Sequence, residues 1–162
     1  KVGGEINNVI FTAYSNKGHE GFLGDSVIGE WCNIGADSNN SNLKNDYSEV
    51  KLWSYSTQRF EKTGLQFCGL IMGDHSKCGI NTMFNTGTVV GVAANIALSG
   101  FPRNFVPSFT LSTSKGIEKT SLTNFYNVAE RVLARRGLVM NDGDKAIFNA
   151  VFEETIHFRA RF

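Results

Sequence analysis

The sequence lacks any segment typical of a membrane anchor or a secretion signal. No unbroken apolar run approaches about 18 residues, and no charged leader precedes an apolar stretch. We therefore expect a protein without a membrane partner that works in the cytoplasm.

The sequence also lacks a charge imbalance and a cysteine framework. Lys and Arg number 16 against 15 Asp and Glu, and the basic residues are spread along the chain, so no nucleic-acid partner is predicted. The three cysteines, Cys32, Cys68 and Cys78, are odd in number and lie among apolar or small neighbours. This pattern predicts buried thiols, with no disulfide and no zinc site.

A chain of 162 residues is long enough for one buried core and short for two. We expect a single domain with an appendage. The chain begins at Lys1, without methionine and inside an already patterned segment, so we expect a fragment or the C-terminal part of a longer protein.

A repeat of six residues is the strongest pattern. The stretch before residue 101 carries an apolar or Cys side chain every sixth residue: Met72, Cys78, Phe84, Val90 and Ile96. Glycine often follows directly, and small residues stand four places on: Ser76, Thr82, Thr88, Ala94 and Gly100. The same phase occurs earlier at Leu23, Ile28 and Ile34, with one step of five residues.

A period of six fits neither a helix nor an alternating strand. It fits a coil with three flat faces, in which each large apolar side chain points inward and stacks on its counterpart three hexads later. The sequence predicts such an all-β parallel β-helix over residues 1–118, with a loop at about 43–69 extruded from one corner. Loops of this length usually carry function.

The last segment, residues 119–162, has helical periodicity and is predicted to cap the coil. A stripe from Leu122 through Phe125 to Leu133 predicts a helix that ends near Gly137. A second helix is predicted to begin at Asn141, with a capping interaction to Asp144. The residues that this helix is expected to bury are Ile147, Ala150 and Val151.

One segment points to chemistry. It reads His19-Glu20-Gly21-Phe22-Leu23-Gly24-Asp25 and is followed by Asn33-Ile34-Gly35-Ala36 and Asn42. This run resembles the acetyltransferase half of the bifunctional bacterial enzymes that acetylate glucosamine-1-phosphate and uridylate the product, where a His-x-x-Tyr-Leu-Gly-Asp segment precedes similar hexads. The resemblance is close over about residues 1–43 and limited to repeat phase over 70–100. It implies a left-handed coil, a homotrimer and acetyl-CoA as the acyl donor.

The resemblance also implies roles for single residues. His19 takes the place of the general base, and Glu5 that of an acidic residue that orients it. The positions that match substrate-binding residues, or that offer a replacement cation for the sugar phosphate, are Phe22, Asn33, Asn42 and Lys44. The positions expected to contact the coenzyme are Ala36, Asn42 and Lys115. No metal site is predicted.

Several positions depart from the family pattern. Phe22 replaces a tyrosine, Asn7 a lysine, Leu43 a tyrosine and Asp37 a glycine. By hexad count, Ile80 and Leu98 occupy places where the family has small residues along the coenzyme groove. These departures leave the phosphate-binding set incomplete and predict a narrower groove.

Three functions remain open from the sequence. The first is acetyl transfer to an amino-sugar phosphate, with the active site between adjacent prisms of a trimer. The second is a coil without chemistry that serves as a trimerisation or regulatory platform for an upstream nucleotidyltransferase domain. The third is a carbonic-anhydrase-like metal site, although the three histidines show no paired ligand spacing.

Three further residue groups have plainer interpretations. His75 beside Asp74 is predicted to face outward, and His157 has no supporting context. The asparagines at 39, 40 and 45 fit corner and turn chemistry. Trp53, Tyr55 and Phe60 are expected to pack the loop against a neighbouring subunit.

Overall fold

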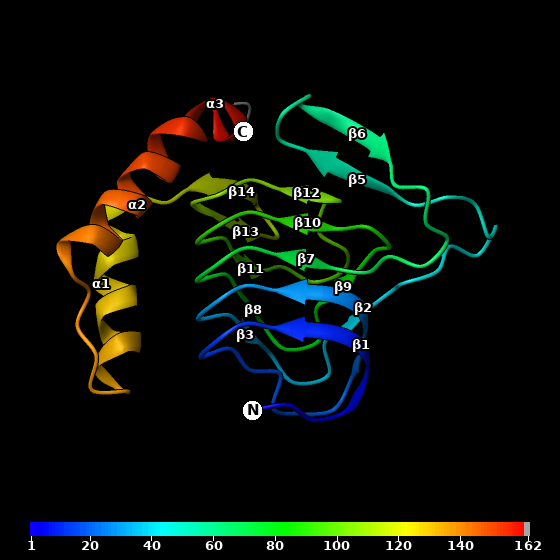
Figure 1. The fold of residues 1–162 in the computed structure, drawn as a ribbon, viewed down its shortest axis with the longest axis horizontal. Helices are drawn as coiled ribbons and strands as arrows, with labels where there is room; N and C mark the ends of the chain where they lie inside the picture. The colour runs from blue at the N-terminus through cyan, green and yellow to red at the C-terminus, as the bar shows by residue number, and fades with distance from the viewer. Residues whose placement is uncertain (161–162) are drawn as a thin grey trace.

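The computed structural model describes residues 1–160 as a stack of parallel coils, with helices along one side of the stack (Figure 1). It confirms the predicted left-handed parallel β-helix with a C-terminal helical cap. One face of the prism is a five-stranded parallel sheet in the order β1-β2-β7-β10-β12. Its strands are Glu5–Phe11 (β1), Phe22–Ile28 (β2), Ile71–Met72 (β7), Val89–Val90 (β10) and Phe105–Val106 (β12).

The second face is a sheet in the order β14-β13-β11-β8-β3, in which only β13 and β14 pair antiparallel. Its strands are Asn33–Ile34 (β3), Lys77–Cys78 (β8), Asn95–Ala97 (β11), Thr110–Thr113 (β13) and Gly116–Lys119 (β14). The third face carries the parallel pair Asn39–Asn40 (β4) and Met83–Phe84 (β9).

The inward side chains form the stacks that the hexad pattern predicts. All five residues from Met72 to Ile96 in that pattern are at most 4% exposed. On the first face the strand register aligns Ile28 with Met72, Met72 with Val90, and Val90 with Val106. Of the predicted small residues, Ser76, Thr82, Thr88 and Ala94 are buried and Gly100 is half-buried. The core is therefore a column of side chains along the prism axis.

The step of five residues between Leu23 and Ile28 coincides with an irregular strand. Both residues lie in the single strand β2, where an odd separation would place them on opposite sides of a regular strand. Asp25 and its neighbour Asn8 in β1 both have a left-handed backbone, with φ of 47° and 52°. This local irregularity turns the strand so that Leu23 and Ile28 both point inward, at 2% and 0% exposure.

One corner of the prism is a ladder of residues with left-handed backbone. The corner ladder consists of the following non-glycine residues, whose φ lies between 54° and 59°: Tyr14, Trp31, His75, Ala93 and Phe109. Tyr14 stacks on Trp31 with ring centroids 4.1 Å apart, and Trp31 on His75 at 6.0 Å. His75 points out of the prism toward Phe125 and Phe148, as predicted, but it does not face solvent, because the C-terminal helices cover this corner and leave His75 only 5% exposed.

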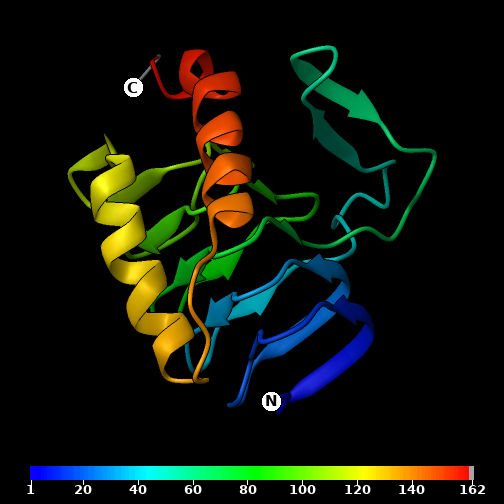
Figure 2. The same cartoon turned by 60° about the vertical axis from the view of Figure 1, so that its left-hand side comes forward.

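Both predicted helices are present, and both lie against that corner (Figure 2). Helix α1 spans Leu122–Ala134 with Ser121 as its N-cap, and it buries Phe125, Ala129 and Leu133. Gly137 follows with φ 68°, and Leu138 N–H bonds the Leu133 carbonyl, which closes the helix end. Within residues 1–160, no helix is long and apolar enough to cross a membrane.

Helix α2 spans Asp142–Glu154, and Asn141 and Asp144 form the predicted capping box. Its buried face was predicted correctly only at Val151, which packs on the core. Ile147 is 62% exposed and Ala150 is exposed, and Phe148 and Phe152 pack there in their place. The aromatic side chains decide the orientation, because they fill the space over the corner ladder. A short helix, α3, follows at Ile156–Arg159.

The segment between β4 and β7 contains an antiparallel hairpin, Lys51–Ser54 (β5) and Arg59–Lys62 (β6). Trp53 stacks on Phe105 at 4.3 Å, and Tyr55 contacts Phe158 edge-on at 5.2 Å. These aromatic contacts lie within the chain, so the expected role of Trp53 and Tyr55 in a neighbouring subunit is not needed to explain their packing.

Candidate functional site

His19 lies at the corner that leads into β2, and its side chain is exposed. Its backbone is held in place by Lys17, whose Nζ donates to the carbonyl oxygens of His19 at 2.9 Å and Gly3 at 3.2 Å. Lys17 is only 1% exposed, and its burial lowers the pKa of the ammonium group. A buried cation therefore fixes the turn that presents the candidate base.

Glu5 begins β1 on the adjacent coil, in register with Phe22 of β2. The coils approach closely here: a Cβ on Gly4 would lie 2.9 Å from the His19 carbonyl oxygen and 2.6 Å from that of Gly21. Glu5 and His19 thus lie on neighbouring coils at one edge of the prism, both exposed. In residues 1–160, no hydrogen bond or ion pair joins the two side chains.

Phe22 and Asn42 flank Gly24. A Cβ on Gly24 would lie 2.4 Å from Phe22 Cζ and 3.0 Å from Asn42 Nδ2, so only glycine allows both side chains to sit there. Asn42 Nδ2 donates to Asp25 Oδ2 at 2.7 Å, and Asn8 Nδ2 donates to Oδ1 of the same carboxylate at 3.4 Å. Asp25 therefore orients Asn42, a role that the sequence reasoning did not assign.

The remaining predicted site residues lie elsewhere. Asn33 is exposed in β3 on the second face, and Ala36 follows in the turn toward β4, so one prism does not bring them together with Phe22. Lys44 donates to the Glu49 carbonyl at 2.8 Å and to Ser48 Oγ at 3.4 Å, within its own loop. Lys115 is exposed in the turn between β13 and β14, at the opposite end of the coil stack (Figure 1).

Sequence reasoning missed two polar residues that support the site. Lys17 stands six residues before Leu23, and Asn40 stands six residues after Ile34, so both occupy inward hexad positions. Asn40 is 5% exposed and bonds both the N–H of Gly24 at 2.7 Å and its carbonyl at 3.0 Å. A polar residue in the inward phase was the available signal for both.

The two positions expected to narrow a coenzyme groove differ in the structure. Ile80 is 69% exposed and projects from the turn after β8, whereas Leu98 is half-buried and packs on the apolar core. Only Ile80 therefore adds bulk to the outer surface. Within the described part of the chain, no three or more His, Cys, Asp or Glu residues gather in a way that suits a metal ion.

The hexads, the coil and the corner ladder define the class: a left-handed parallel β-helix built from hexapeptide repeats. No family model matches the chain. The chain is 40% identical over 73 residues to the bifunctional protein GlmU of Methanocaldococcus jannaschii, a match that covers 45% of this chain and 17% of that protein.

Two further relatives extend the similarity. The chain is 33% identical over 92 residues to the bifunctional sugar-1-phosphate nucleotidylyltransferase/acetyltransferase of Sulfurisphaera tokodaii, covering 57% of this chain and 22% of the relative. It is 29% identical over 132 residues to the bifunctional protein GlmU of Methanococcus vannielii, covering 82% and 28%. The chain thus spans less than a third of the curated relatives it matches, and its resemblance to such bifunctional transferases is established.

Proposed function

We propose that this chain is an acetyltransferase domain that transfers an acetyl group from acetyl-CoA to the amine of an amino-sugar phosphate, within a longer sugar nucleotidyltransferase-type protein. The observation that carries the proposal is the exposed His19 at a corner held in place by Lys17, beside the coil that bears Glu5. The similarity of the chain to bifunctional transferases supports it.

The proposed chemistry needs a neutral imidazole. The sugar amine attacks the thioester carbonyl carbon of acetyl-CoA while His19 accepts the proton that the nitrogen loses. The tetrahedral intermediate then expels the coenzyme as its thiolate, and the C–S bond breaks as the amide C–N bond remains. A carboxylate at Glu5 favours the imidazolium that forms, so Glu5 acts as a positioning residue through His19.

We also propose that the working unit is a homotrimer with its active site between two prisms. Phe22, Asn42 and His19 belong to the β2 edge, whereas Asn33 and Ala36 belong to the second face of the same prism. Residues on two faces of a convex prism can meet around one substrate only if one set comes from an adjacent copy. This separation supports a shared site.

The test is an acetyl-transfer assay on the full-length protein, with glucosamine-1-phosphate, acetyl-CoA and a thiol reagent that detects released coenzyme. We expect His19→Ala to lower turnover by about 10²-fold or more. Glu5→Gln is expected to lower turnover less than His19→Ala does, because Glu5 acts through His19 and does not itself accept the proton. Glu118→Gln, an exposed carboxylate change in β14, serves as the matched control. Turnover that survives His19→Ala in a folded protein contradicts the assignment.

The second candidate is a coil that trimerises an upstream nucleotidyltransferase domain without chemistry of its own. Two observations favour it. Lys17 and Lys44, the cations near the site, already donate to backbone carbonyls. Phe22 has no hydroxyl that could bind a phosphate. Calorimetry with acetyl-CoA separates the two candidates. A trimer by light scattering that shows no heat with saturating coenzyme and forms no product favours the scaffold.

A further inference from the structure

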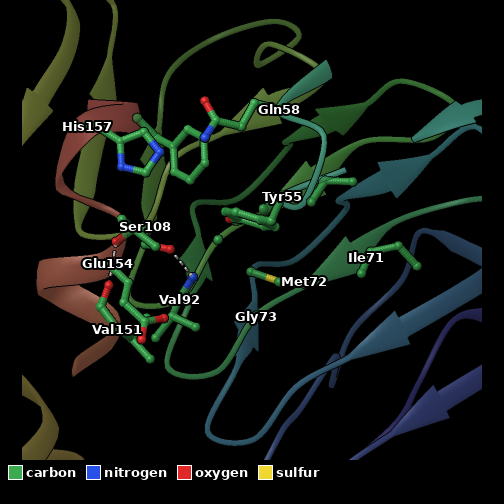
Figure 3. Close-up of a pocket in the computed structure, with 15 residues that line it drawn as sticks. Tyr55, Gln58, Ile71, Met72, Gly73, Val92, Ser108, Val151, Glu154 and His157 are labelled. Atoms are coloured by element: carbon green, nitrogen blue, oxygen red, sulfur yellow. Dashed lines mark hydrogen bonds between the residues drawn. The ribbon is translucent and has the colours of Figure 1, made fainter. Parts of the chain in front are cut away.

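The structure contains a pocket of about 470 Å³ that includes none of the candidate site residues (Figure 3). Its floor is the outer side of β7 and β10, with Ile71 and Val89. One wall is the hairpin tip with Tyr55 and Gln58, and the opposite wall is the end of α2 and the start of α3. Segments far apart in the sequence therefore line a single open pocket of the size that small-molecule sites have.

The lining of this pocket is mainly apolar and carries little charge. The aromatic rings of Tyr55 and Phe158 contact each other edge-on at 5.2 Å and form part of the rim. Among residues 1–160, no Lys or Arg lines the pocket, and Glu154 supplies its carboxylate, with the His157 imidazole nearby on α3. On the inner wall the Ser108 hydroxyl oxygen accepts from the Val92 N–H at 3.0 Å.

This charge pattern argues against phosphorylated ligands. Acetyl-CoA and sugar phosphates are polyanions, and sites for them collect Arg, Lys or backbone N–H donors. A carboxylate without a cation in the lining repels such groups and accepts a hydrogen bond from an N–H. The apolar floor, in turn, gains free energy from any flat apolar body that displaces water from it.

We propose that this pocket is a ligand site, separate from the acyl-transfer site, for a small aromatic molecule that carries an N–H donor and no negative charge. Its rings lie on Ile71 and Val89 beside the Tyr55–Phe158 ring pair, and its N–H points to the Glu154 carboxylate. A bound ligand contacts both the hairpin and the C-terminal helices, so it ties these two elements together over the prism face.

The test uses two fluorescent probes with the same ring skeleton. N-phenyl-1-naphthylamine is neutral and has one N–H, and 8-anilinonaphthalene-1-sulfonate adds a negative charge. We expect saturable, one-to-one binding of the neutral probe to the full chain, and weaker binding of the sulfonate. Glu154→Gln should reduce the ratio of the two probes' affinities by about threefold. The effect is this small because the carboxylate is exposed and solvent screens its charge. Glu153→Gln, one residue away and outside the pocket, should leave it unchanged.

Two pocket-filling variants test the location. Val151→Trp on α2 and Ile71→Trp on β7 each place an indole in the same space from opposite sides, and each should weaken the neutral probe by about tenfold or more. Two variants are used so that a packing defect in one does not decide the result. The proposal is overturned if the neutral probe does not saturate, if either folded variant binds it as tightly as the parent, or if both probes bind equally in the parent.

Discussion

The His75 ring lies along the Trp31 indole with centroids 6.0 Å apart and planes within 23°, and its Nδ1 has no hydrogen-bond partner among residues 1–160. Phe125 of α1 and Phe148 of α2 meet the same ring edge-on at 5.5 and 5.2 Å. Burial, and secondarily the charge of Lys77, lower the pKa of His75 to about 4, while Asp144 acts in the opposite direction. The helical cap is thus packed on a neutral histidine.

This relationship predicts an acid-sensitive cap. Between pH 6.5 and 4 the unfolded chain binds a proton at His75 that the folded chain excludes, so the free energy of unfolding falls as the pH drops. Above pH 6.5 the effect is absent, because His75 is neutral in both states. The depressed pKa corresponds to about 3 kcal/mol lost across this window, an order-of-magnitude figure.

Urea unfolding of the parent and of His75→Phe at a series of pH values measures the effect. Phenylalanine is compatible with this corner, because Phe109 occupies the equivalent place with φ 54°. Subtracting the free energy of unfolding of His75→Phe from that of the parent cancels the carboxylate titrations. This difference should fall as the pH is lowered from 6.5 to 4. His157→Gln, at an exposed histidine, should follow the parent. A difference that stays constant with pH contradicts the prediction.

The hexad spacing predicted the coil because each hexad forms one of the three faces of a turn. On each face the inward side chain must be small or apolar. The spacing predicted the burial of Cys78 and Ile96 correctly for that reason. It did not predict that His75 is buried, because the first of the helices that cover it begins at Leu122, 47 residues later in the chain. The orientation of α2 was missed for a related reason: Phe148 and Ile147 are adjacent apolar residues, and only the shape of the surface beneath selects between them.

The candidate site was predicted less completely than the fold. His19 and Glu5 were found from a resemblance that runs along the chain, and the structure places them on neighbouring coils. Asn40 was missed because the asparagines were interpreted as corner chemistry. Lys17 was missed because the hexad phase was not extended from Leu23 back to a polar residue. The separation of Asn33 from Asn42 depends on which face of the prism each hexad occupies. Counting residues assigns hexads to faces only when the position of the first corner is known.

Lys17 is predicted to stabilise the first coil through its two hydrogen bonds to backbone carbonyls. Lys17→Met keeps the apolar stem and removes the donors, so the free energy of unfolding should fall by about 1–3 kcal/mol. Lys51→Met, at an exposed position of β5, should change it by less than about 0.5 kcal/mol. Chemical denaturation of the three proteins provides the comparison. An unchanged or higher stability of Lys17→Met is inconsistent with this role.

Asn40 and Asn39 form a natural pair of test positions. Asn40→Leu leaves the buried N–H and carbonyl of Gly24 without their side-chain partner, and we expect a loss of about 2–4 kcal/mol in unfolding free energy. Asn39 accepts the exposed Phe22 N–H at 2.8 Å, where water replaces a lost acceptor, so Asn39→Leu should cost less than about 1 kcal/mol. Equal losses at both positions would falsify the buried role of Asn40.

Ser112 offers the opposite sign of effect. It is 1% exposed in β13, in register with Ile96, and its hydroxyl has no hydrogen-bond partner in the described part of the chain. Ser112→Ala removes a buried polar group that gains nothing from folding, so thermal unfolding should show an increase in stability of about 1 kcal/mol.

Ser76 is equally buried, but its hydroxyl donates to the Gly91 carbonyl and accepts the Ala94 N–H at 3.0 Å. Ser76→Ala should therefore destabilise the coil by about 1–3 kcal/mol. The two substitutions remove the same atom from the same prism interior, so shifts of equal sign would mean that hydroxyl pairing does not decide the outcome.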